Sequence, residues 1–201
     1  MAERTRILLA TNNPGKVREF RRLIADARLE VVTPAEVGIS LDVDETGSTY
    51  AENATLKARA FAEAGNCLAL ADDSGIEVDA LEGRPGLYSA RYGGAGLDDE
   101  GRTALLLTEL DGVAPPHRTA RYRAVVALAW PDRESVELFE GIQEGTVGFA
   151  PEGSGGFGYD PVFLVDEIRT QAQISDEEKD DRSHRGKAVR AAVAWLGEHC
   201  L

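Results

Sequence analysis

The chain is poor in cysteine, in aromatic residues and in long apolar runs. Its 201 residues include two cysteines, Cys67 and Cys200, which are too few for a disulfide framework and lack the spacing of a zinc site. No stretch approaches the roughly 18 to 20 apolar residues that a membrane-spanning helix needs. Residues 1–6 lack the apolar segment of a secretion signal. These absences predict a cytoplasmic protein that enters no membrane.

Basic residues are also scarce relative to acidic ones. Lys and Arg number 22 against 35 Asp and Glu, which gives a formal net charge of −13. A surface this acidic repels phosphate backbones and anionic lipids, so we expect no nucleic-acid partner and no membrane-surface partner. An anionic small molecule can still bind, but only where local cations or a metal ion overcome this field.

The pattern of apolar residues predicts a mixed α/β sheet. Residues 7–10 form a short apolar run, after which Asn13 suits a helix N-cap and Pro14 the first helical position. Ser175 and Glu178 fit a capping box before another helix. We find no linker, so residues 1–201 are expected to form a single domain. Further predicted elements are strands at 29–32, 67–71, 76–81 and 161–165, helices at 49–64 and 98–110, a hairpin of 119–130 with 135–143, and a last helix after residue 183.

A strand-to-helix loop at residues 11–16 is the first candidate site. Helix N-termini present N–H groups and partial positive charge, which suit a phosphate. In this loop Gly15 permits close backbone approach, and Lys16 adds a full cation. The loop matches neither the P-loop nor the dinucleotide fingerprint, and an ordinary capped turn is the alternative. Its residues are Thr11, Asn12, Asn13, Pro14, Gly15 and Lys16.

Two adjacent carboxylates, Asp72 and Asp73, follow a buried strand, where ligands bind in open α/β sheets. Together with Asp42, Asp44 and Glu45 of a nearby acidic loop they offer the hard oxygen ligands that Mg²⁺ prefers. Because neighbouring side chains on a strand point to opposite faces, Asp72 and Asp73 should not serve one metal equally. The alternative is that they cap the next element.

Two later segments can contact a ligand. In the glycine-rich stretch at 153–161, Phe157 and Tyr159 supply flat faces that can stack on a base, unless these rings return to the core. Lys179 and residues 183–187 offer cationic donors inside an acidic run. A solvated, salt-bridged surface is the alternative for this second segment.

Taken in order, these segments resemble the inosine triphosphate pyrophosphatase family, and the match spans nearly the whole chain. Each fragment is weak alone, whereas the ordered set is specific. The fragments are Thr-Asn-Asn-Pro-Gly-Lys at 11–16, Glu-Thr-Gly at 45–47, Glu-Asn-Ala at 52–54, Lys-Ala-Arg at 57–59, Ala-Asp-Asp-Ser-Gly at 71–75, Pro-Gly at 85–86, Ser-Ala-Arg-Tyr at 89–92, Gly-Gly-Phe-Gly-Tyr-Asp-Pro at 155–161, Glu-Lys at 178–179 and Ser-His-Arg-Gly at 183–186.

The resemblance implies an elongated mixed β-sheet with flanking helices, two lobes around a central cleft, a homodimer and dependence on Mg²⁺. It also implies a reaction, in which ITP, dITP or XTP and water give the monophosphate and pyrophosphate. By the same resemblance, the 11–16 loop and Lys179 hold phosphates, and Asp73 and Glu45 bind the metal. Asp73 is also the implied proton acceptor, and Ser74 contacts the substrate. The implied base pocket consists of Phe157, Gly158, Tyr159, Asp160, His184 and Arg185.

Chemistry gives reasons for these roles and leaves alternatives open. Asp73 cannot easily be both a full metal ligand and a free base, and we assign it chiefly to the metal and to water positioning. Donors from His184 or Arg185 aimed at the C6 oxygen of hypoxanthine or xanthine would reject adenine. The main rival is a related house-cleaning pyrophosphatase with another base preference. A nucleotide-binding module without turnover and a phosphomonoesterase with an aspartyl nucleophile are the others.

Overall fold

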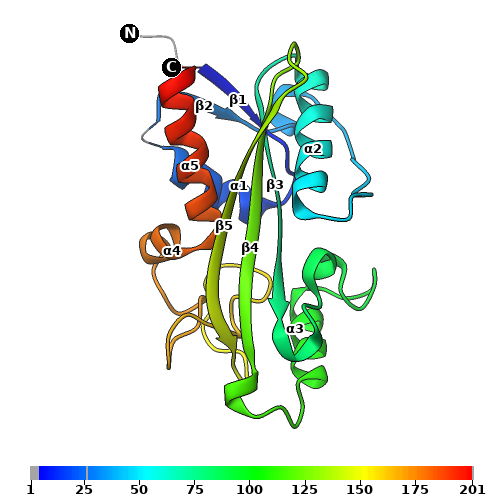
Figure 1. The fold of residues 1–201 in the computed structure, drawn as a ribbon, viewed down its shortest axis with the longest axis vertical. Coiled ribbons are helices and arrows are strands. Elements are labelled where there is room, and N and C mark those ends of the chain that lie inside the picture. The colour runs from blue at the N-terminus through cyan, green and yellow to red at the C-terminus, as the bar shows by residue number, and fades with distance from the viewer. Residues whose placement is uncertain (1–4, 26, 201) are drawn as a thin grey trace. The chain divides into compact units, whose positions relative to one another are not determined.

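The computed structural model describes residues 5–25 and 27–200. Its strands form one six-stranded sheet in the order β2-β1-β3-β4-β5-β6 (Figure 1). Strand β1 pairs in parallel with β2 and with β3, and β5 pairs antiparallel with β6. The predicted mixed α/β fold is therefore confirmed. The strands are β1 (Thr5–Leu9), β2 (Leu29–Val32), β3 (Ala69–Val78), β4 (Thr119–Ala129), β5 (Val136–Val147) and β6 (Phe163–Leu164), and the helices are α1 (Pro14–Ile24), α2 (Tyr50–Gly65), α3 (Asp99–Glu109), α4 (Asp176–Arg182) and α5 (His184–His199).

The described residues fall into two compact units, each with its own core. Unit 1 comprises the described residues up to Asp73, then Ala124–Gly141, and those from Arg185 on. Unit 2 comprises Ser74–Arg123 and Ile142–His184. The chain passes between the units inside strands β3, β4 and β5 and at the start of α5. The expectation of a single domain stays a prediction.

In unit 1, helices lie on both faces of the strands (Figure 1). Ile7 and Leu9 of β1 belong to one apolar cluster with Phe20 of α1 and Leu196 of α5. Leu8, between them in the strand, points to the opposite face. A side chain added at Gly65 of α2 would meet Leu8, so α2 covers this second face.

The helices begin where the sequence predicts caps. Asn13 accepts a hydrogen bond from the backbone N–H of Lys16 (3.1 Å). Ser175 accepts from the backbone N–H of Glu178 in the same way (3.2 Å). These bonds span three residues and satisfy N–H groups that a helix leaves without intrahelical partners. The predictions of both helix starts are confirmed.

Strand β3 corrects the sequence-based assignment. It runs from Ala69 to Val78 without a break, so the prediction of separate strands at 67–71 and 76–81 is wrong. Asp72 and Asp73 lie inside this strand and are buried. Burying a charged group costs free energy unless the group is paired, and the contacts described below provide partners for both Asp72 and Asp73. β5 also continues past the predicted end at residue 143, and β6 is shorter than the predicted 161–165.

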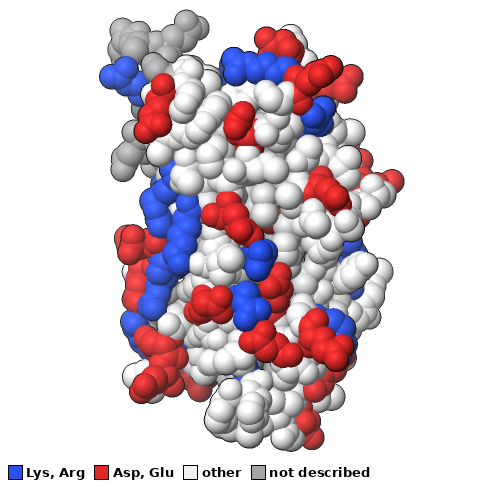
Figure 2. Space-filling model, viewed as in Figure 1, with Lys and Arg blue, Asp and Glu red and all other residues white. Residues whose placement is uncertain are grey.

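Unit 2 has a separate apolar core. Ile76 and Val78 of β3 pack there with Leu106 of α3 and Phe163 of β6. Acidic and basic side chains are interspersed on the molecular face in Figure 2. None of the described helices is long and apolar enough to span a membrane.

Candidate functional site

Asp72 is a buried carboxylate of β3 held by two cations. Its Oδ1 lies 2.9 Å from Nζ of Lys16, and its Oδ2 accepts a hydrogen bond from Nε of Arg185 (3.1 Å). Burial by itself raises the pKa of Asp72, but Lys16 and Arg185 hold that pKa well below its usual range. Asp72 is therefore a fixed negative charge that ties the first turn of α1 to β3.

Arg185 lies between two buried carboxylates. Besides Asp72, its Nη1 donates to Oε2 of Glu19 at 2.6 Å. Burial opposes the charged guanidinium, yet Asp72 and Glu19 raise the pKa of Arg185 overall. Nε and Nη1 thus bind carboxylates of unit 1, and contact of Arg185 with a base stays a prediction. We did not predict Glu19, although a charged residue next to Phe20 on the buried face of α1 was a signal.

The 11–16 loop is anchored by its own polar groups. The backbone N–H of Asn13 donates to Oγ1 of Thr11 (3.2 Å), while the Asn13 side chain caps α1. Gly15 is buried, and the next residue, Lys16, is half-buried. Burial lowers the pKa of Lys16, although Asp72 opposes this effect. A lysine and a helix N-terminus thus meet in this loop, as an anion site requires.

Asp73 has partners different from those of Asp72, as alternation along the strand predicts. It accepts hydrogen bonds from Nδ2 of Asn53 (3.1 Å) and Nζ of Lys57 (3.2 Å). Lys57 also donates to Oε1 of Glu45 at 2.6 Å. Burial raises the pKa of Asp73; Lys57 opposes that shift, and the like charge of Glu45 adds to it. A buried carboxylate with a raised pKa is a candidate proton acceptor.

Sequence reasoning missed Asn53 and Lys57 as site residues. They lie four residues apart on α2 and therefore share one face of the helix. Asn53 is fully buried, whereas the buried residues around it on this helix are mostly alanine and aromatic. Two polar residues at this spacing on an otherwise apolar face were the signal that could have found them.

The donor set around Asp73 fits a small divalent cation. Asp73 and Glu45 both approach the ammonium group of Lys57, so a positive charge already stands between the two carboxylates. Within residues 5–25 and 27–200 no group of three or more His, Cys, Asp or Glu side chains forms a ready metal site. Mg²⁺ needs only one or two carboxylates and takes its other ligands from water and substrate phosphates.

In unit 2, Asp160 organises the glycine-rich segment. Its Oδ2 accepts hydrogen bonds from Nζ of Lys179 (2.6 Å) and from the backbone N–H of Phe157 (2.8 Å). The side chains of Asp160 and Lys179 are 5% and 4% exposed, so this ion pair is buried. Nζ of Lys179 also lies 5.2 Å from the ring centre of Phe157. Three residues predicted from the sequence are therefore in contact.

Gly156 is required by this arrangement. Its φ is +72°, and a Cβ added there would overlap Oδ2 of Asp160 and lie 2.9 Å from Nζ of Lys179. No side chain fits in that space. Gly158 also has a positive φ, and its N–H donates to Oδ2 of Asp99 (3.0 Å).

The other residues predicted in unit 2 differ in exposure. Tyr159 is 5% exposed in the core of unit 2, and its hydroxyl donates to the backbone oxygen of Ser89 (2.9 Å). Its ring has returned to the core, which corrects the expectation of an open stacking face and leaves the half-buried Phe157 as the candidate. The ring of His184 stacks on Tyr122, with centres 4.7 Å apart and planes at 10°. Ser74 is half-buried in β3.

Comparison with known sequences agrees with these features. A family model described as the Ham1 family matches residues 7–195. The dITP/XTP pyrophosphatase of Streptomyces coelicolor is 48% identical over 197 residues, covering 96% of this chain and 98% of its own length. The dITP/XTP pyrophosphatase of Bacillus subtilis is 44% identical over 184 residues, covering 91% and 92%. The resemblance seen in the ordered motifs is confirmed.

Solved structures share the fold. The Ham1 protein of Staphylococcus aureus superposes with a TM-score of 0.84 at 40% identity, and a HAM1 protein from Coxiella burnetii with 0.86 at 36%. Each alignment covers 96% of this chain and 99% of the other. This chain therefore belongs to the Ham1 family.

Proposed function

We propose that this protein hydrolyses the non-standard purine nucleotides ITP, dITP and XTP to the monophosphate and pyrophosphate, and so removes them from the nucleotide pool. The observation that carries the proposal is the pair of carboxylates, Asp73 and Glu45, on either side of Lys57 in the unit that holds Lys16. The names of the curated relatives support the purine class. They do not favour the alternative of another base preference.

The triphosphate needs cations, because a protein with a net charge of −13 otherwise repels it. We assign this task to the loop of residues 11–16, to Lys16 and to Lys179. In the loop, Asn13 holds the first turn of α1 in place and Thr11 supports Asn13. Preorganised donors of this kind stabilise charge that develops on phosphate oxygens.

Asp73 and Glu45 are the residues that would hold Mg²⁺. When bound, Mg²⁺ would neutralise phosphate charge and lower the pKa of a coordinated water. Asn53 and Lys57 fix the orientation of the Asp73 carboxylate through both of its oxygens. We assign Asp73 first to metal holding and water positioning, and second to accepting the proton of the attacking water.

Base selection is assigned to unit 2 and to Arg185. Phe157 would stack on the purine, and Ser74, Gly158, Tyr159 and Asp160 would shape its site. Donors from His184 or Arg185 to the C6 oxygen would meet an amino group in adenine instead. One unmade buried hydrogen bond costs about 1–3 kcal/mol, or roughly 5- to 150-fold in rate.

We further propose that the protein acts in the cytoplasm as a homodimer without a nucleic-acid partner. The excess of acidic residues supports the last point, because phosphate backbones are repelled. Sedimentation measurements on the purified chain test the dimer. A mass equal to one chain would contradict it.

A nucleotide panel tests the activity. ITP, dITP, XTP, ATP, GTP and dUTP are incubated with the protein and MgCl₂, and pyrophosphate and orthophosphate are measured separately. We expect steady pyrophosphate release from ITP, dITP and XTP, its loss with EDTA, and its return with excess Mg²⁺. Release of at most one equivalent would indicate a binding module, and orthophosphate a phosphomonoesterase. Preferred turnover of dUTP would favour the rival base preference.

A further inference from the structure

Tyr122 of β4 touches two residues of the base site in two different ways. Its ring stacks on His184, and its hydroxyl donates to Oδ1 of Asp160 at 3.2 Å. We propose that Tyr122 is a positioning residue that fixes His184 and Asp160 before the nucleotide binds. The proposal rests on the proposed function, because that function assigns base recognition to His184.

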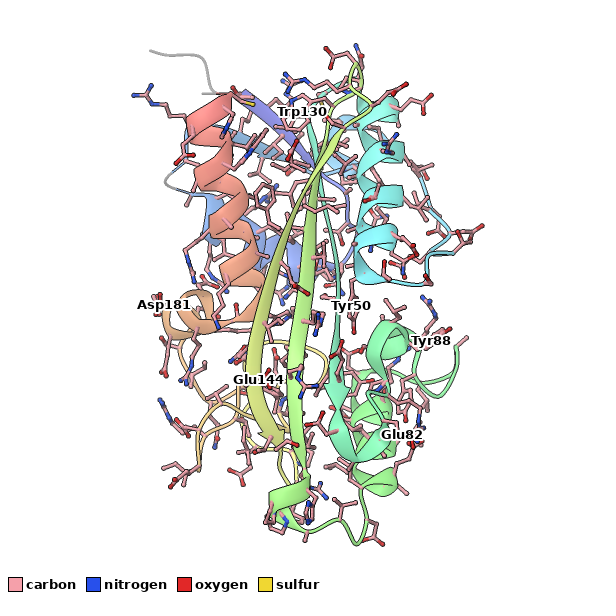
Figure 3. The ribbon with its side chains drawn as sticks, in the orientation of Figure 1. Tyr50, Glu82, Tyr88, Trp130, Glu144 and Asp181 are labelled. Carbon is pink, nitrogen blue, oxygen red and sulfur yellow. The ribbon has the colours of Figure 1, made fainter. Side chains whose placement is uncertain are left out.

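The direction of Tyr122 follows from its place in β4. Arg121 and Arg123, on either side, pair with carboxylates of neighbouring strands, among them Glu144, which Figure 3 labels on β5. Alternation along a strand places Tyr122 on the other face. There it is 7% exposed and belongs to the core of unit 2.

The hydroxyl adds a further donor to Asp160. Oδ2 of Asp160 already takes two donors, Lys179 and the backbone N–H of Phe157. Oδ1 takes the donor from Tyr122. Contacts to both oxygens hold the carboxylate plane, so removing the hydroxyl lets Asp160 and Lys179 rotate together. The Tyr122 hydroxyl thereby sets the position of the Lys179 ammonium group.

The ring acts separately from the hydroxyl. Phe163 packs against Tyr122 with centres 4.5 Å apart at 48°, and His184 lies parallel to it at 10°. A ring held by Phe163 has little freedom, and stacking passes that restraint to the imidazole of His184. The plane of the imidazole determines where its N–H groups point. The ring of Tyr122 therefore bears on base selectivity, whereas its hydroxyl bears on substrate affinity.

Two substitutions separate these effects from a general packing role. Tyr122→Phe removes the hydroxyl and keeps the stack. We expect it to raise KM for dITP roughly 5- to 30-fold with kcat within about twofold, because the lost contact serves substrate and transition state alike. Its ratio of kcat/KM for ITP over ATP should stay within about twofold of wild type. Tyr122→Leu removes the stack and should lower that ratio at least about tenfold.

Tyr92→Phe is the matched control. Tyr92 is also a buried tyrosine of unit 2, and its hydroxyl donates to a carboxylate, Glu109, at 2.6 Å. Neither Glu109 nor Arg84, which bonds the same hydroxyl, is assigned to the substrate, so KM of this variant should equal that of wild type. Thermal melting of all three variants reports any general loss of packing.

Proton NMR of the His184 ring gives a readout that packing alone does not move. The chain has three histidines, so the ring resonances can be assigned by substitution. The ring current of Tyr122 should shift the His184 protons in wild type and Tyr122→Phe, and the shift should vanish in Tyr122→Leu. If Tyr122→Leu does not fold, Tyr122→Phe and the wild-type spectrum still decide.

The outcomes separate the two proposals. A wild-type chain that releases no pyrophosphate from dITP overturns the proposed function and this role with it. If wild type is active and Tyr122→Phe has the same KM for dITP, the positioning role alone is overturned. The same conclusion follows if folded Tyr122→Leu keeps the wild-type preference for ITP, or if wild type lacks the ring-current shift.

Discussion

Nζ of Lys57 lies 3.2 Å from Oδ1 of Asp73 in the interior of unit 1. The same ammonium group lies 2.6 Å from Glu45, so one cation serves two carboxylates. Two like charges in a poorly solvated place repel each other unless a cation stands between them. Lys57 therefore holds Asp73 and Glu45, the two proposed metal ligands, on one ammonium group.

Asp73→Asn tests the reacting carboxylate. The amide cannot accept a proton and is a weaker metal ligand, so we expect kcat for dITP to fall about 10²- to 10⁴-fold. Pyrophosphate release measures the effect. Asp79→Asn is the control, because Asp79 is an exposed aspartate bonded to Thr119. A kcat near the wild-type value in Asp73→Asn would remove this residue from the mechanism.

The pH dependence of kcat/KM tests Lys16. Burial lowers the pKa of Lys16 below the usual 10.5, while Asp72, Lys57 and Arg185 are the charged groups that face it. The phosphate-binding, protonated form is therefore lost at a lower pH than for an exposed lysine, and kcat/KM should decline on the alkaline side. Arginine stays protonated, so Lys16→Arg should move that decline to higher pH. An unchanged profile, as expected for the exposed Lys187→Arg, would contradict the assignment.

The buried pair of Glu19 and Arg185 should control stability. Glu19→Gln leaves Arg185 with less compensating charge in the interior, and we expect the free energy of unfolding to fall by about 3–5 kcal/mol. The double variant, Glu19→Gln with Arg185→Met, removes both charges and keeps the ion pair of Lys16 and Asp72. Its loss of unfolding free energy should be smaller than the sum of the losses in Glu19→Gln and in Arg185→Met. Urea denaturation of the two single variants and the double variant measures these losses.

A matched control for this pair is Glu36→Gln. Glu36 also pairs with an α1 arginine, Arg21, at 2.6 Å, but in an exposed position. The free energy of unfolding of Glu36→Gln should therefore equal that of wild type. Equal stability of Glu19→Gln and Glu36→Gln would show that burial of Glu19 has no energetic consequence.

Arg185→Ala is also predicted to reduce the preference for ITP over ATP, and the loss of the contacts of Arg185 with Asp72 and Glu19 should lower stability as well.

Gly156→Ala should disrupt the buried pair of Asp160 and Lys179. The new methyl group would collide with Asp160, and the positive φ adds backbone strain, so we expect a loss of about 2–4 kcal/mol and much weaker dITP turnover. At Gly94, which has a φ of +94° and no neighbour within 4 Å, alanine meets the backbone strain alone. Gly94→Ala should cost about 1 kcal/mol. Similar losses for both variants would mean that the space around Gly156 is not tight.

Interactions between residues close in the chain could be predicted from the sequence. The caps at Asn13 and Ser175 join groups three residues apart, and such a bond needs only the start of the helix to form. The alternation of Asp72 and Asp73 follows from strand geometry alone. The ordered motifs likewise indicate the family, because residue identity and order along the chain are enough to recognise them.

Partners distant in the chain were decided by the tertiary structure. Arg185 meets Glu19 across 166 positions, and Tyr122 meets Asp160 across 38. No local pattern encodes such pairs, because they depend on how helices pack on the sheet and on which face of a strand each side chain occupies. The unbroken course of β3 was missed for the same reason. Residues 72–74 read as a strand end in the sequence. Only distant partners, Lys16 and Arg185 for Asp72 and Asn53 and Lys57 for Asp73, make it possible to bury these two carboxylates within the strand.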